Sequence, residues 1–158
     1  MTPSGGDVIA LDTSALLRYL IGDDPGLADR VARIIEGDEP VGISTPVLVE
    51  VVHTLRGLPG PLPNPQVADT LIELLAHNNV VLTDLSGDLA AAAIAGVRHL
   101  SPTHIVDALI CAGARQAGAT RLLTNDSKFA SRLVPVIQLD ELSDEDGAPP
   151  SPERKSNE

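Results

Sequence analysis

Aromatic side chains are nearly absent from this 158-residue sequence, which has no tryptophan, one tyrosine and one phenylalanine. Stacking on aromatic rings is a common way to read single-stranded bases, so the composition excludes a stacking platform of that kind. The single cysteine, Cys111, excludes a disulfide framework and a thiolate metal cluster within one chain. No apolar run approaches the roughly 20 residues of a membrane span, and no basic, apolar leader is found. We therefore expect a cytoplasmic protein without a membrane partner.

Basic side chains are scarce as well. The chain has 11 lysines and arginines against 22 acids, which gives a formal net charge of −11. An acidic surface opposes nonspecific binding to nucleic acid, because that binding depends on neutralising phosphates with Lys and Arg. This repulsion of nucleic acid is weaker wherever the acids bind metal ions.

Helix starts are marked clearly, because a capping residue is followed directly by proline four times. The four pairs are Asp24-Pro25, Thr45-Pro46, Asn64-Pro65 and Ser101-Pro102. They predict helices near residues 25–37, 46–56, 65–78 and 102–117, and Ser86 predicts another that runs to about Arg98. Short apolar runs lie between them at 8–11, 41–43, 80–82, 122–123 and 136–137. This alternation predicts an α/β fold of three layers, with a central, mainly parallel sheet flanked by helices.

The domain is expected to end near residue 142. From Ser143 to Glu158 the chain is rich in proline, serine and acids and has almost no apolar residues. Such a composition cannot bury enough apolar surface to fold, so we expect one domain over residues 1–142 and a disordered tail over 143–158.

Two acids are expected at the carboxyl ends of strands. The unbroken apolar run Val8–Leu11 ends at Asp12, which predicts a central strand buried on both faces with an acid at its end. The run Leu122–Leu123 leads in the same way to Asp126. Ligands bind at this edge of open α/β sheets. The alternative interpretation is that each acid only caps a helix or a turn.

Two other acids lie within nearly apolar helical segments. Glu50 stands between Val49 and Val51, and Asp107 follows Ile105-Val106. A lone carboxylate there costs several kcal/mol unless it is paired or binds a metal. Because bases are few, a cation is the natural partner. The alternative is that both acids lie at the margin of an apolar face, solvated or bonded to arginine.

Four carboxylates form an oxygen-rich set of ligands, which selects Mg²⁺ or Mn²⁺ over zinc. Such ions bind phosphate oxygens and activate water, so metal-assisted phosphodiester hydrolysis follows without a protein nucleophile. His104 shares a helical face with Asp107, or is an ordinary residue of a first turn. Four polar neighbours would orient the carboxylates, or simply form caps and turns. These are Thr13, Ser14, Thr124 and Asn125.

The segment Leu11–Leu20 followed by Gly22–Pro25 resembles the opening of PIN-domain proteins, specifically the VapC-type toxins of toxin–antitoxin pairs. The resemblance spans about residues 7–139 and continues, in the family's order, through 49–51, 106–110 and 122–129. It implies a PIN-like fold and an endoribonuclease that uses one or two Mg²⁺ or Mn²⁺ ions. It also implies a cognate antitoxin as inhibitor and a homodimer. The residues that match the family's acidic quartet are Asp12, Glu50, Asp107 and Asp126.

The match departs from the family at Ser14, where relatives often have asparagine. Tyr19 and the apolar face of the first helices are plausible antitoxin contacts under this resemblance. With so few rings, we expect recognition of RNA shape and phosphate position rather than of stacked bases. The candidate substrate-binding residues are Arg18, His104 and Lys128.

Two other functional classes stay open. A phosphotransfer α/β domain also places Asp after its first strand, but a dehalogenase-like phosphatase needs a second Asp where Ser14 stands. For a receiver domain, Asp84 and Lys128 fit only loosely, and neither scheme explains Glu50. The second class is a non-catalytic PIN-like interaction domain. A degenerate member of that kind would usually lack an acid of the quartet, whereas this chain has all four.

Overall fold

The computed structural model describes residues 8–101, 103–129 and 131–141. The tail predicted for residues 143–158 lies outside the described residues. Within the described ranges, no helix has the length and apolar character needed to cross a membrane.

The strands of these described ranges all run parallel, and they form two separate sheets. The first sheet has the order β1-β2-β3, and Ile9 pairs with Val41, which pairs with Val80. The second sheet consists of β4 and β5 alone, with Leu122 opposite Val136. The strands are β1 (Ile9–Ala10), β2 (Val41–Ile43), β3 (Val80–Leu82), β4 (Leu122–Thr124) and β5 (Val136–Gln138), followed by the short 3₁₀ helix η1 (Leu139–Glu141).

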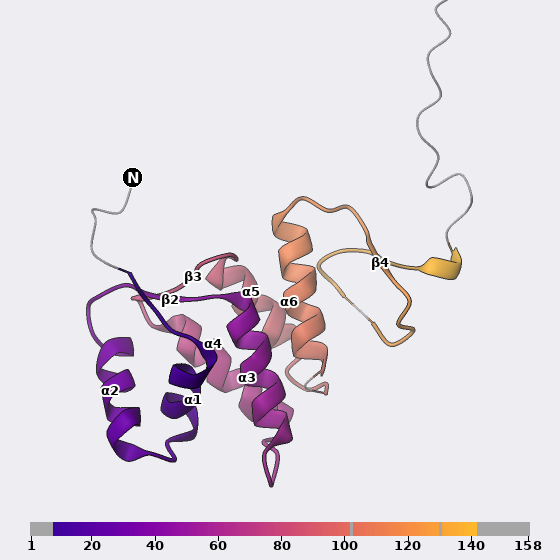
Figure 1. The fold of residues 1–158 in the computed structure, drawn as a ribbon. Helices are drawn as coiled ribbons and strands as arrows, with labels where there is room; N and C mark the ends of the chain where they lie inside the picture. The colour runs from indigo at the N-terminus through magenta and orange to yellow at the C-terminus, as the bar shows by residue number, and fades with distance from the viewer. Residues whose placement is uncertain (1–7, 102, 130, 142–158) are drawn as a thin grey trace, which may run out of the picture.

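In the described residues, six α-helices lie in pairs between the first four strands, which confirms the predicted α/β fold class. Each end predicted from the capping pattern lies within two residues of the observed one. The helices are α1 (Thr13–Ile21), α2 (Pro25–Ile35), α3 (Thr45–Gly57), α4 (Asn64–Ala76), α5 (Gly87–Gly96) and α6 (Thr103–Gln116). In Figure 1, α3 stands between α1 and α6, and β4 lies beyond α6.

Two of the predicted capping residues act as expected. The Asp24 carboxylate accepts the Leu27 N–H at 3.1 Å, and the Ser86 hydroxyl accepts the Leu89 N–H at 3.3 Å. These local bonds satisfy backbone donors that the first helical turn leaves free.

Two others were predicted wrongly. Thr45 is not a cap. Its N–H and its hydroxyl both donate to Asp84 Oδ1, and the Thr45 nitrogen and hydroxyl oxygen each lie 2.9 Å from that atom. Asn64 is buried and works as a donor, with its amide nitrogen 3.0 Å from both the Val97 and Arg98 carbonyl oxygens. In both cases a distant segment supplies a better partner than the neighbouring backbone.

The core lies between the first sheet and the helices. Val41 and Ile43 of β2 are fully buried and belong to one apolar cluster with Leu48 of α3, Leu71 of α4 and Ile105 of α6. Neighbouring contacts link α1 with α3, α3 with α6, and α4 with α5. Helix α3 therefore packs against both α1, which Asp12 caps, and α6, which carries Asp107.

The first strand does not occupy the predicted central position. Val8 and Ile9 are 59% and 38% exposed, and β1 lies at the edge of its sheet. The central strand is β2, which pairs on both sides. Gly42 suits this place, because a Cβ there would meet the Val8 and Thr83 methyl groups at 3.2 and 3.1 Å. The apolar run at 8–11 indicated a strand correctly but not its neighbours.

Candidate functional site

Asp12 joins β1 to α1 and caps that helix. Its Oδ1 accepts the Ser14 hydroxyl at 2.8 Å and the Ala15 N–H at 2.9 Å. The Ala15 N–H is the main reason that the pKa of Asp12 is lowered, and the Ser14 hydroxyl adds to it. The side chain is exposed. Asp12 is thus a fixed, ionised carboxylate at the carboxyl end of a strand.

Glu50 lies on α3, where its carboxylate accepts a hydrogen bond from the Thr13 hydroxyl. Thr13 is the first residue of α1, so this bond places Glu50 beside the start of the helix that Asp12 caps. Glu50 is exposed, whereas Leu48 and Val51 are fully buried. The expectation that Glu50 lies in an apolar environment is therefore wrong. Successive helical residues differ by about 100°, and Glu50 falls on the solvent side.

Asp107 lies on α6 and is partly buried. Burial is the main cause that raises its pKa, the His104 charge opposes this, and the Asp126 charge raises the pKa further. His104 Nδ1 is 2.8 Å from the Ser101 hydroxyl. The protein environment therefore disfavours the ionisation of Asp107, as expected for a group that a cation would stabilise.

Asp126 follows β4 in a tight turn. Its N–H donates to the Thr124 hydroxyl at 3.0 Å, and its carboxylate accepts the Lys128 N–H at 2.9 Å. Gln138 of β5 donates its side-chain amide to the Asp126 carbonyl at 3.0 Å. Sequence patterns missed Gln138, because only the pairing of β4 with β5 brings it there. Asn125 is exposed beside this turn.

The structure therefore brings the four acids together in two pairs. Asp12 and Glu50 flank Thr13 at the contact of α1 with α3, while the charge of Asp126, after β4, raises the pKa of Asp107 on α6. Over the described ranges 8–101, 103–129 and 131–141, no group of three or more His, Cys, Asp or Glu side chains could hold a metal ion. The donor chemistry nevertheless fits a hard divalent cation, because every candidate ligand is a carboxylate.

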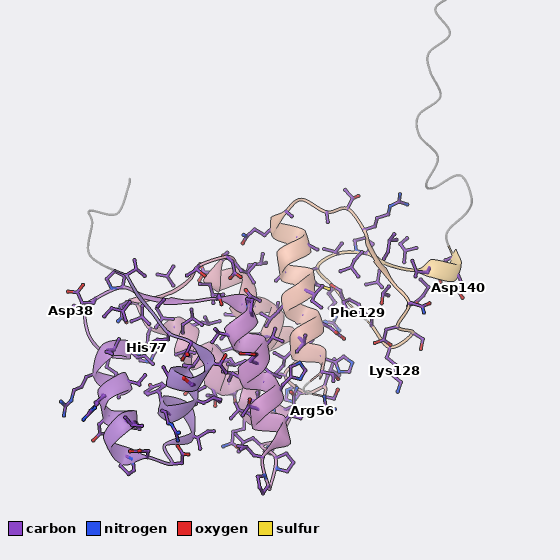
Figure 2. The ribbon with its side chains drawn as sticks, in the orientation of Figure 1. Asp38, Arg56, His77, Lys128, Phe129 and Asp140 are labelled. Atoms are coloured by element: carbon purple, nitrogen blue, oxygen red, sulfur yellow. The ribbon has the colours of Figure 1, made fainter. Side chains whose placement is uncertain are left out.

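The predicted substrate-binding residues differ in availability. Arg18 forms an exposed ion pair with Asp23 at 2.9 Å. His104 is partly buried and bonded to Ser101, whereas Lys128 is exposed. Figure 2 shows Lys128 on the outside of the segment that follows β4. Of these three predicted residues, Lys128 is thus the one whose charged group is most accessible to a ligand.

Tyr19, the suggested antitoxin contact, lies on α1 and is partly buried. Burial is the main cause that raises its pKa, and the negative charges of Glu36 and Glu73 raise it further. The ring thus packs against the edge of the apolar core, while its hydroxyl is influenced by two acidic side chains.

Comparison with known proteins adds one finding to this geometry. A family model described as "PIN domain" matches residues 9–132, which is well over half of the chain and includes the four acids. None of the curated proteins matches the chain.

Proposed function

This chain belongs to the PIN domain family, generally a metal-dependent nuclease domain, and from that premise we propose that it is an endoribonuclease using Mg²⁺ or Mn²⁺. We further propose that it is a VapC-type toxin controlled by a cognate antitoxin. The observation that carries the proposal is the pair of acids Asp107 and Asp126. Burial raises the pKa of Asp107 and the charge of Asp126 raises it further, and a cation bound there would relieve both effects.

Asp12, Glu50, Asp107 and Asp126 would hold the metal, because carboxylate oxygens are the ligands that Mg²⁺ and Mn²⁺ prefer. When bound, such an ion supplies charge neutralisation at the scissile phosphate and a lowered pKa for an attacking water.

The chain's own side chains would orient these ligands. The hydroxyls of Ser14 and Thr13 hold the carboxylates of Asp12 and Glu50, respectively, in fixed directions. The charge of His104 lowers the pKa of Asp107, and the 2.8 Å contact of its Nδ1 with the Ser101 hydroxyl would orient the ring. The bonds from Lys128 and Gln138 fix the turn of Asp126.

The test is cleavage of a bulk RNA mixture by the purified full chain with Mg²⁺, with Mn²⁺ or with EDTA. We expect cleavage only with metal, and loss of cleavage in both Asp12→Asn and Asp107→Asn. Asp29→Asn is the matched control, because Asp29 is an exposed carboxylate on α2. Circular dichroism checks that each variant is folded. Cleavage that survives in Asp107→Asn or in EDTA would contradict the proposal.

The antitoxin proposal has its own support on the α1–α2 hairpin. Ile21 and Leu27 are each 39% exposed there, close along the chain to Tyr19. An apolar helix of a small partner would bury these side chains. Co-expression with an adjacent small reading frame should yield a complex that no longer cuts RNA. Size-exclusion chromatography with light scattering would test the proposed homodimer in the same preparation.

A non-catalytic PIN-like interaction domain is the second candidate, favoured by the lack of a three-ligand cluster among the described side chains. Calorimetric titration with Mn²⁺ separates the two, because an interaction domain has no need to bind the ion. The phosphotransfer alternative gains no support, since the Asp84 carboxylate already accepts the Thr45 N–H and hydroxyl.

A further inference from the structure

Positive charge is concentrated in one stretch of this acidic chain. The stretch 115–132, which we call the basic segment, has four bases and one acid, Asp126, whereas residues 8–114 have five bases and 13 acids. The bases of the segment are Arg115, Arg121, Lys128 and Arg132, and all four side chains are exposed. The segment therefore has a net charge of +3, whereas the whole chain has a net charge of −11.

Two cations of this segment, Lys128 and Arg132, are available for a ligand, unlike two arginines elsewhere. Arg18 is paired with Asp23, and Arg98 is paired with Asp69. Within the described part of the chain, Lys128 and Arg132 form no ion pair. Such exposed charges gain most from a polyanion, because little must be broken before phosphate binds.

The segment also adjoins two acids of the candidate site. It begins on α6, the helix of Asp107, and it contains the turn of Asp126, whose carboxylate accepts the Lys128 N–H. Arg115 Nη1 donates to the Leu133 carbonyl at 3.0 Å, which places its guanidinium next to the residue that follows Arg132. Arg115 thus lies on the helix of Asp107, and Lys128 lies in the turn of Asp126.

We propose that the basic segment binds the phosphodiester backbone of RNA, with Lys128 and Arg132 as its principal contacts. The proposal rests on the proposed nuclease function and assigns the substrate-binding surface for it. Recognition through phosphate charge agrees with the near absence of aromatic rings for base stacking. The next acids along the chain, Asp140 and Glu141, lie outside the segment, in η1.

The experiment measures binding separately from cleavage. A fluorescein-labelled RNA of mixed sequence, about 20 nucleotides long to exceed one site, is titrated with the full chain in EDTA and followed by anisotropy. The test variant is Lys128→Gln with Arg132→Gln. The matched control is Arg30→Gln with Arg33→Gln, which removes the same charge from exposed positions on α2.

We expect the test variant to bind about tenfold more weakly than the wild type. The slope of log affinity against log salt should fall by about 1.4, since each single-strand phosphate contact contributes about 0.7. The control should change affinity by less than about twofold, as a general field effect would. Circular dichroism checks that both variants fold.

Equal weakening of test and control would overturn the proposal, because only net charge would matter. Unchanged binding of the test variant would overturn it as well. Loss of antitoxin binding with intact RNA binding would overturn it too and would assign the segment to an acidic protein partner. RNA binding that needs the segment, without any cleavage, would support this inference while contradicting the nuclease proposal. A wild type that neither binds nor cuts RNA would contradict both.

Discussion

Replacing Asn64 tests whether the link between α4 and the end of α5 stabilises this fold. The side chain is 7% exposed, and its amide nitrogen lies 3.0 Å from both the Val97 and Arg98 carbonyl oxygens. Its Oδ1 is buried without a partner among the described residues. The two bonds fix the segment that leads into α6, the helix of Asp107.

The two substitutions at this position should differ in size. Asn64→Ala removes two hydrogen bonds of about 1 kcal/mol each, but it also removes the unpaired oxygen, so we expect a loss of about 1–2 kcal/mol. Asn64→Asp directs carboxylate oxygens at two carbonyl oxygens, and a buried charge without a partner costs about 3–5 kcal/mol. For a chain of this length that corresponds to a fall in Tm of roughly 6–20 °C.

Urea unfolding followed by circular dichroism measures both losses. Asn78→Asp is the control, since Asn78 is exposed and undergoes the same chemical change. Burial raises the pKa of the introduced carboxyl, so the Asn64→Asp protein should regain stability between about pH 7 and about pH 5 as that group takes up a proton. A free energy of unfolding for Asn64→Asp within about 0.5 kcal/mol of the control would refute the reasoning.

Three further predictions follow from the core and the acids. Asp107→Asn should stabilise the metal-free protein at neutral pH, because burial raises the Asp107 pKa above 3.8 and ionisation therefore lowers stability as pH rises through the folded-state value. Thermal unfolding in EDTA checks this, and the gain should vanish below about pH 3.8, whereas a gain that persists there would contradict the pKa argument. Leu48→Ala, at a fully buried position of α3, should lower the free energy of unfolding by about 2–5 kcal/mol, while an equal loss at exposed Leu100 would contradict this packing. Saturating Mn²⁺, at about 100 times its Kd, should stabilise the wild type by about 2.7 kcal/mol and Asp12→Asn by much less, and equal shifts in Tm would remove Asp12 from the ligands.

Local patterns predicted the helices well. Asp24 and Ser86 cap the helices expected of them, because their partners lie three residues ahead and need no tertiary contact. Thr45 and Asn64 were misread because Asp84 and the end of α5 reach them from distant parts of the chain. A capping pattern cannot reveal a competing partner of this kind.

The sheet shows the same division between local and long-range information. The apolar run at 8–11 indicated a strand, but its place at the sheet edge depends on β2 pairing with both β1 and β3. Similarly, Glu50 was expected in an apolar environment, and only the packing of Leu48 and Val51 shows that it faces solvent. The partly buried position of Asp107, in contrast, follows from its apolar neighbours Ile105 and Val106 on α6.

The position of Tyr19 gives this chain a built-in spectroscopic reporter. The sequence has no tryptophan, so this single tyrosine, packed on α1, is the main source of intrinsic fluorescence. Its emission therefore describes the surroundings of one helix, the helix that Asp12 caps. Circular dichroism averages over all helices instead. Coincident fluorescence and dichroism transitions would show that α1 unfolds together with the rest, and an earlier fluorescence transition would show that α1 and its packing open first.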